Sequence, residues 1–359
     1  MSVRKIETRF DILRLLLAVF LAMGVAVVII LFLSDDPQLS LKYLLLGPLT
    51  TKRRFGNVIE SVIPLLFTGV GVCIMYSANQ TNMAAEGSFF LGGVFATAIA
   101  IRTMPPVIHP ILCILFGGIA GSFVTMIPAL LYTRFGARPV VSSLMMNHIA
   151  SSLGIFMINY LFFDASAGFT CSLPFQKTAK LPVFVSKTSI HIGIFIGVFV
   201  VIMGWFYLYR SKNGYEIRTV GKNVSFAKYI GISVPSVIIY CQVIGGFLAG
   251  MGGAVEVLGM YNRFQYQGLT NHGFDGILVA IIAKYNPAMV PFSALFLSYV
   301  RVGADIMSRM TDVPVEIVYV VQSVIILFVT AERFLGGLKH KSIVREIERS
   351  MEQEEKANG

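Results

Sequence analysis

Long, nearly uninterrupted runs of apolar residues most constrain how this chain folds. The first run, from Ile12 to Leu33, contains a single charged residue, Arg14. A helix rises about 1.5 Å per residue, so roughly 20 apolar residues cross the ~30 Å hydrocarbon core of a bilayer. Similar runs recur along the chain as far as about residue 331, and only 13% of its 359 residues are charged. Because soluble domains carry about 25% charged residues, a water-soluble globule is excluded.

The apolar runs predict an all-α, polytopic membrane protein with about ten transmembrane helices. The first run is too long for a signal-peptide core and precedes no small-residue cleavage site, so we interpret it as a retained span. The runs that would form the third, eighth and ninth spans are short. We expect spans near residues 12–33, 58–76, 88–101, 107–132, 140–163, 190–209, 236–259, 274–283, 288–302 and 314–331.

The distribution of Lys and Arg favours a cytoplasmic location for both termini. The predicted loop 210–235 is rich in basic residues, whereas the basic stretch Lys52–Arg54 in the first outer loop argues against this orientation. The net charge of +10 is therefore a topology signal rather than a sign of nucleic-acid binding. We predict a multi-pass protein of the bacterial inner membrane, with residues 1–335 as the transmembrane domain and 336–359 as a charged cytoplasmic tail.

A short motif occurs twice. Thr81–Gly87 and Thr270–Gly276 both read Thr-Asn-x-x-x-acid-Gly, and a Met-Tyr pair precedes each copy. Five predicted spans lie between the copies, and an odd number means that they cross the bilayer in opposite directions. The pattern indicates an inverted-topology internal repeat, with halves at about 58–163 and 236–331. Transporters use this plan to move two halves about a shared site near the midplane.

Polar residues in and near these copies are candidates for a solute pathway. Intramembrane carboxylates are costly, so they usually face a cavity or a partner. Interrupted helices also expose free N–H groups. The alternative is structural: the Asn side chains cap helices and the acids complement helix dipoles. Glu256 in the seventh span is expected to be paired or near an interface. The pathway candidates are Asn82, Glu86, Asn147, Asn271 and Asp275.

The loop 210–235 contains a short predicted helix between Asn223, a good N-cap, and Gly231, a good C-terminal residue. Phe226 and Ile230 share one face of it, with Ala227 beside them. Such a helix is a docking element for a partner groove, or an interfacial helix on the anionic leaflet. The chain lacks a G-x-x-x-x-G-K-[ST] phosphate loop, so active transport would take its energy from an ion gradient or a partner ATPase.

Several segments form a recognisable set, in order along the chain: Asn82–Gly87, Leu144–Ala150, Glu216–Gly231, Gly245–Gly259, Gly273–Ala280 and Asn286–Pro287. Together they resemble the permease subunits of ABC importers of the ribose and nucleoside (BPD_transp_2-type) family. The variants Glu-Val-Leu-Gly and Leu-Met-Met-Asn look closer to the purine nucleoside importer permeases. His148 and Ser143 depart from the family pattern, where an aromatic residue and Thr are usual.

The resemblance implies a permease that forms half of a translocation pathway for a nucleoside-like or sugar-like solute and works by alternating access. It implies three partners: a cytoplasmic ABC ATPase that binds ATP and Mg, a second homologous permease, and an extracellular solute-binding lipoprotein. This chain would bind no cofactor or metal. ATPase coupling would fall to Gly221, Asn223, Phe226, Ala227, Tyr229, Ile230 and Gly231.

Two other classes of protein compete with this interpretation. An ion-coupled secondary transporter would share the repeat but would not need the docking helix. A membrane-embedded enzyme is disfavoured because no nucleophile–base set, HExxH motif or acidic metal cluster is present. The solute itself stays open among purine nucleosides, ribose-like sugars and riboflavin-like compounds.

Overall fold

The computed structural model describes residues 36–184 and 188–314, together with 24–25, 27–32, 34, 316, 319–320 and 323. The predicted spans 12–33 and 314–331 fall largely outside these residues, and the charged tail 336–359 lies outside them entirely. The chain divides into two compact units. Residues 48–302 form the large unit, and residues 1–47 and 303–359 form the other.

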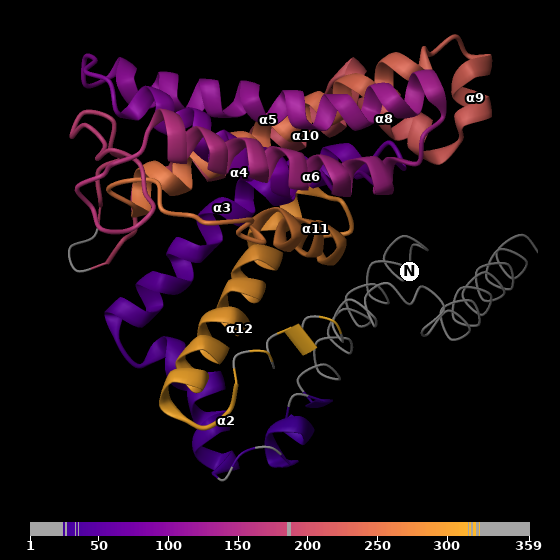
Figure 1. Ribbon diagram of the computed structural model, residues 1–359. Coiled ribbons are helices and arrows are strands. Elements are labelled where there is room, and N and C mark those ends of the chain that lie inside the picture. Colours follow the sequence, from indigo (N-terminus) through magenta and orange to yellow (C-terminus); the bar gives the residue numbers. More distant parts are fainter. Residues whose placement is uncertain are drawn as a thin grey trace, which may run out of the picture. The chain divides into compact units, whose positions relative to one another are not determined.

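The described residues confirm an all-α, polytopic membrane protein (Figure 1). Six of their helices are long and apolar enough to cross a membrane, and α4 and α11 are shorter apolar helices that match the predicted short third and eighth spans. The helices from α3 onward are α3 (Lys52–Tyr76), α4 (Ala85–Ala100), α5 (Ile108–Phe135), α6 (Pro139–Phe156), α7 (Gly193–Arg210), α8 (Lys212–Lys222), α9 (Val224–Tyr229), α10 (Val234–Met260), α11 (His272–Ile282) and α12 (Val290–Met310).

The ninth span is longer than predicted, because α12 continues to Met310 rather than ending near residue 302. Charged residues interrupt its apolar run. Arg301 forms an ion pair with Asp275 of α11, and Arg309 pairs with Asp305 one turn earlier on the same helix. Pairing removes much of the cost of these charges, so the helix extends past the point where hydropathy alone predicts its end.

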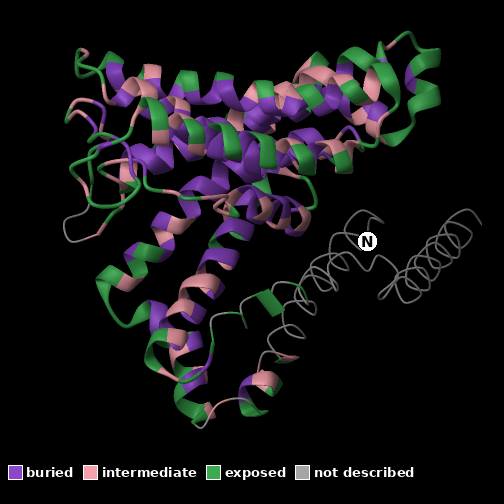
Figure 2. Cartoon of the chain, in the orientation of Figure 1, coloured by how far each residue is buried: buried purple, intermediate pink, exposed green. Residues whose placement is uncertain are grey.

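Helix α10 is the centre of the large unit and packs against α5, α4 and α3. Its glycines allow this close approach: a Cβ atom on Gly250 would collide with the backbone of Gly117 in α5. Small residues let helix backbones approach closely in membrane proteins. Figure 2 shows buried residues where these helices face one another and exposed residues on their outer sides. The Gly-rich stretch of the seventh span is therefore a packing surface.

The smaller unit contains a helix that was not predicted, α2 (Pro37–Leu46). Its start carries local signals: Asp36 accepts a hydrogen bond from the Leu39 N–H at 3.1 Å, and Pro37 occupies the first helical turn. Both residues favour a helix N-terminus. The segment treated as part of an outer loop is thus helical, and it is too short to cross a bilayer.

Candidate functional site

The Glu86 carboxylate, in the first turn of α4, holds the beginning of α11. One of its oxygens accepts hydrogen bonds from the backbone N–H groups of Thr270 and Asn271, both at 2.7 Å. The other accepts from Gly273 at 2.6 Å and from Phe274 at 3.4 Å. The first N–H groups of a helix lack intrahelical acceptors, and the helix dipole favours an anion there. Glu86 is fully buried, and because both of its oxygens accept hydrogen bonds, it acts as a carboxylate cap on another helix.

This contact, which we call the α4–α11 junction (Glu86 with residues 270–274), joins the two motif copies. A Cβ atom on Gly273 would collide with the backbone of Glu86, so the two chain segments approach as closely as glycine permits. Both short helices begin here, and in Figure 1 α11 lies beside the bundle that contains α4. The sequence predicted that the copies share a site, and the structure brings them into direct contact.

Two of the predicted pathway residues hold the start of α4. Asn147 of α6 accepts from the Gly87 N–H at 2.8 Å and donates to the Met83 carbonyl at 2.9 Å. Asn82 accepts from the Ala84 N–H at 2.9 Å. These bonds correspond to the structural alternative left open by the sequence. Glu86 also fits the structural alternative. Its carboxylate complements the dipole of α11, the helix of the other motif copy, rather than that of its own helix α4.

The other two pathway candidates differ in burial. Asp275 is buried and pairs with Arg301 of α12. Asn271 has an exposed side chain and a left-handed backbone (φ 66°), and its side chain makes no capping bond. The expectation that Asn271 caps a helix is therefore wrong. The Glu86 carboxylate occupies the position that a capping side chain would take.

Sequence reasoning missed His272, which lies at an unconstrained position of the motif. Its Nε2 atom is 3.8 Å from Oε1 of Glu256 in α10, and its ring centroid is 5.1 Å from that of Phe89. Within the described part of the chain, Oε2 of Glu256 and Nδ1 of His272 are buried without a hydrogen-bond partner. Glu256 was expected to be paired or at an interface, and it is only partly satisfied. The sequence signal that could have identified His272 was the presence of an ionisable side chain within the predicted pathway.

The long connection between α6 and α7 is tied to the connection that precedes α11. Arg263 contacts the Asp164 carboxylate at 3.0 Å, and the Phe264 N–H donates to the Ser172 hydroxyl at 2.9 Å. Hydrogen bonds from Ser166, together with the nearby Arg263 charge, hold the pKa of Asp164 below its usual value. Arg263 also donates to the buried Cys171 thiol at 3.4 Å. These contacts order the loops at one end of the large unit.

The predicted docking helix is present as α9, at the opposite end of the large unit from these loops (Figure 1). As predicted, Asn223 caps it by accepting from the Phe226 N–H at 3.0 Å. Gly231 follows it with a positive φ of 84°. Phe226 and Ile230 are exposed to 51% and 42%, whereas Ala227 is fully buried beneath them. Ala227 therefore supports the helix from inside and is not part of its exposed face.

Helix α8 connects α9 to the spans. A Cβ atom on Gly221 would collide with the carbonyl of Ser77, which directly follows α3. The Tyr240 hydroxyl of α10 donates to Glu216 at 3.1 Å. Tyr229, at 90% exposure, projects from α9. The two predicted coupling residues thus differ in their surroundings, because Gly221 of α8 packs against the chain that follows α3, whereas Tyr229 of α9 is exposed.

Six helices of the described residues are long enough to cross a membrane, and the two shorter apolar helices, α4 and α11, meet at the junction. Such an arrangement is typical of membrane transporters. Residues 55–330 match the family described as branched-chain amino acid transport system / permease component (BPD_transp_2), and the chain belongs to this family. The resemblance inferred from the motifs is therefore confirmed. The protein is the permease subunit of an ABC importer, and ATP hydrolysis is carried out by a partner subunit.

Three relatives are similar over most of their length. The guanosine ABC transporter permease protein NupP of Bacillus subtilis is 30% identical over 296 residues, which cover 80% of this chain and 84% of NupP. The nucleoside ABC transporter permease protein NupB of Lactococcus lactis is 25% identical, covering 88% and 90%. The glucose ABC transporter permease protein TsgB13 of Haloferax volcanii is also 25% identical, covering 89% and 87%.

Proposed function

We propose that this chain forms half of the translocation pathway of an ATP-driven importer for a nucleoside-like solute, working by alternating access. The 30% identity to a guanosine permease supports a nucleoside over a sugar, although a glucose permease is also similar. We place the protein in a bacterial inner membrane with about ten spans and both termini in the cytoplasm, as the Lys and Arg distribution favours.

The observation that carries this proposal is the α4–α11 junction. Two helices that begin inside a bundle bring the free backbone N–H groups of their first turns into a region where a continuous helix would present only side chains. Glu86, Asn82 and Asn147 satisfy most of these ends, and Asp275 in the first turn of α11 pairs with Arg301 of α12. We infer that the two halves are inverted repeats and that the five predicted residues line or brace the route between them.

Energy would enter through α9. Its exposed apolar face, Phe226 with Ile230, is suited to a groove on a cytoplasmic ABC ATPase. Movement of α9 would reach the end of α3 through the contact of Gly221 with Ser77. Only a short turn separates Ser77 from Asn82 and the start of α4. The coupling element and the junction are thus mechanically connected by the chain itself.

The proposal requires three partners, namely the ATPase, a second homologous permease and an extracellular solute-binding lipoprotein. ATP and Mg would bind to the ATPase. The described residues of this chain contain no group of three or more His, Cys, Asp or Glu side chains placed to hold a metal ion. Solute selection would rest largely with the binding lipoprotein, and the permease would supply the route.

The test is reconstitution of the four components in proteoliposomes with labelled guanosine. We expect uptake that needs ATP and the binding protein and that unlabelled purine nucleosides suppress more strongly than ribose does. Suppression by ribose alone would change the solute class to sugars. Uptake that persists without the ATPase and follows an imposed ion gradient would instead establish the secondary-transporter alternative.

A further inference from the structure

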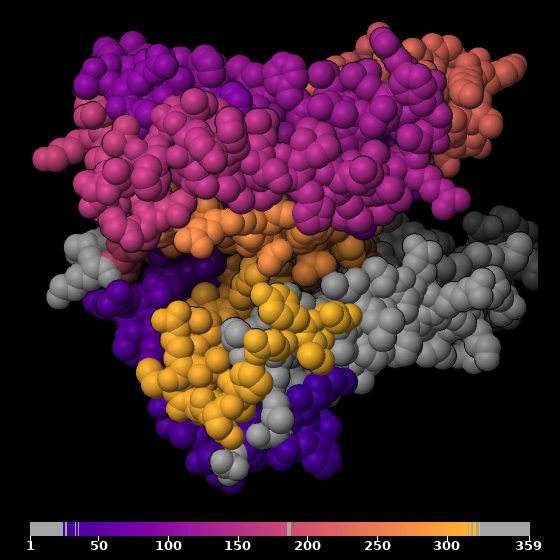
Figure 3. Space-filling model, viewed as in Figure 1, coloured from indigo at the N-terminus to yellow at the C-terminus, as the bar shows by residue number. Residues whose placement is uncertain are grey.

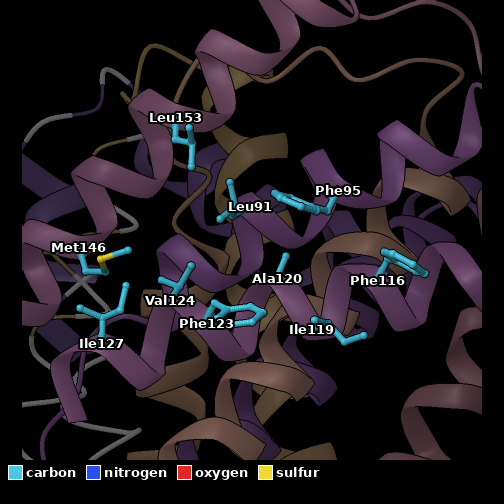
Figure 4. A pocket seen from close by; sticks show the side chains of 10 residues that line it. All are labelled: Leu91, Phe95, Phe116, Ile119, Ala120, Phe123, Val124, Ile127, Met146 and Leu153. Carbon is cyan, nitrogen blue, oxygen red and sulfur yellow. The ribbon is translucent and has the colours of Figure 1, made fainter. Parts of the chain in front are cut away.

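An apolar groove of about 410 Å³ lies on the outer side of α4, α5 and α6 (Figure 4). Ala120 and Val124 of α5 are buried at its floor, whereas Phe123 is 57% exposed at its edge. Figure 3 shows that α5 and α6, in purple and magenta, cover one face of the large unit. All of the side chains that line the groove are apolar: Leu91, Phe95, Phe116, Ile119, Ala120, Phe123, Val124, Ile127, Met146 and Leu153.

The groove has the dimensions and chemistry of an acyl-chain site. From Phe116 to Ile127 it follows α5 for about 16 Å at the helical rise per residue. That length lies within an apolar helix long enough to span a membrane, so the groove is at hydrocarbon depth. Water or a polar solute would find no hydrogen-bonding partner on such a lining. A lipid acyl chain has no hydrogen-bonding groups, so it fills the groove without losing hydrogen bonds.

Two arginines lie beyond one end of the groove. Arg134 is in the last turn of α5, and Arg138 immediately precedes α6. Both are exposed, and neither guanidinium makes a hydrogen bond or ion pair with any residue that the structure describes. Arg134 is about 10 Å along the helix from Ile127, and Arg138 about 12 Å from Met146. Phe135, which is 77% exposed, lies between them in sequence.

We propose that the groove binds an acyl chain of an anionic phospholipid whose phosphate pairs with Arg134 and Arg138. Basic residues beside a pocket between transmembrane helices attract anionic headgroups, and Arg matches a phosphate bidentately. The bound lipid lies in the leaflet next to the α5–α6 turn. It packs against Met146, which adjoins Asn147, the residue that caps the start of α4. The lipid therefore braces α6 where α6 supports the α4–α11 junction.

The test is native mass spectrometry of the delipidated full-length permease, titrated with phosphatidylglycerol or phosphatidylcholine of identical acyl chains. At roughly 1 kcal/mol for each arginine near a headgroup, we expect phosphatidylglycerol to bind about 30-fold more tightly. The double variant R134Q/R138Q should lose this preference. The matched variant R210Q/K222Q removes the same charge at the same end of the large unit, away from the groove, and should keep it.

A second arm tests the groove itself. Ala120→Phe fills its floor and should reduce binding of both lipids, as should Leu153→Trp at its edge, whereas Val198→Phe on the exposed side of α7 should not. Equal affinity for the two lipids, or unchanged binding after filling the groove, would overturn the proposal. So would a photo-crosslinker at Phe123 that captures a second permease rather than lipid in native membranes, because the groove would then be a protein interface.

Discussion

Replacing Glu86 with Gln is the most informative single change in this protein. The side chain keeps its shape, but only one of its two terminal atoms still accepts hydrogen bonds. In the native protein both oxygens face donors: Thr270 and Asn271 on one side, and Gly273 and Phe274 on the other. Whichever way the amide is oriented, its NH₂ group points at two backbone N–H groups.

The size of the effect follows from these contacts. The Gln variant loses at least one of the short bonds of 2.6–2.7 Å and leaves buried N–H donors without acceptors. A hydrogen bond to a charged group contributes about 1.5–3 kcal/mol, and each buried donor left unpaired costs about 1–3 kcal/mol. Together these changes predict a loss of about 3–6 kcal/mol. At roughly 2 °C per kcal/mol, the melting temperature falls by about 6–12 °C.

Thermal unfolding of the purified permease in detergent measures this loss, and uptake in the reconstituted complex measures its consequence. Glu60→Gln is the matched control, because Glu60 is another buried carboxylate in a span but bonds to the Ser189 side chain rather than to a helix end. Glu86→Asp keeps the charge on a shorter side chain and should give an intermediate loss. If Glu86→Gln melts within about 1 °C of wild type, Glu86 does not hold α11 through its charge.

Three further changes test other parts of the structure. Phe226→Asp should abolish co-purification with the partner ATPase while leaving the melting temperature within about 1 °C of wild type, because the side chain is half exposed. Gly273→Ala should destabilise the permease by about 1–3 kcal/mol through overpacking against the α4 backbone, whereas Gly268→Ala, which meets no atom within 4 Å, should not. Asp164→Asn should expose the buried Cys171 thiol to a membrane-impermeant maleimide. Because the pKa of Asp164 is lowered, the contribution of its contacts is complete above the usual aspartate range and is lost only as pH falls through the lowered value. Wild-type labelling should therefore stay low from about pH 6 to 8.

The spans were predictable because hydrocarbon thickness imposes a length that a single sequence reveals directly. The short third and eighth spans were recognised for the same reason, and they are α4 and α11. The end of α12 was not, since the charged residues Asp305 and Arg309 lie beyond the predicted end at residue 302 and interrupt the hydropathy pattern. On the helix these two residues pair with each other. Helix α2 was missed although Asp36 and Pro37 signal its start, because its ten residues are too short to stand out as a membrane-spanning apolar run.

The functional region was predictable in part. The repeated motif identified the residues of the junction, but a linear pattern cannot show which helix a carboxylate contacts. Glu86 was predicted either to line a solute pathway or to complement a helix dipole, and in the structure it binds the backbone of the other copy. His272 occupies a position where the copies differ, so the repeat gave no reason to select it. Its proximity to Glu256 depends on the fold.

The contacts also indicate which parts of the large unit move together. Displacing α11 from α4 would break the hydrogen bonds of Glu86 at once and leave a buried charge unpaired, which is strongly destabilising. We therefore expect α4 and α11 to move as one body during transport. The contact between His272 and Glu256 is different, because at 3.8 Å it is long and each side chain retains an unpaired polar atom. Separating α11 from α10 forfeits little hydrogen bonding and would let a solute or water satisfy those atoms. Conformational change in the large unit should thus separate α11 from α10 rather than open the junction between the two motif copies.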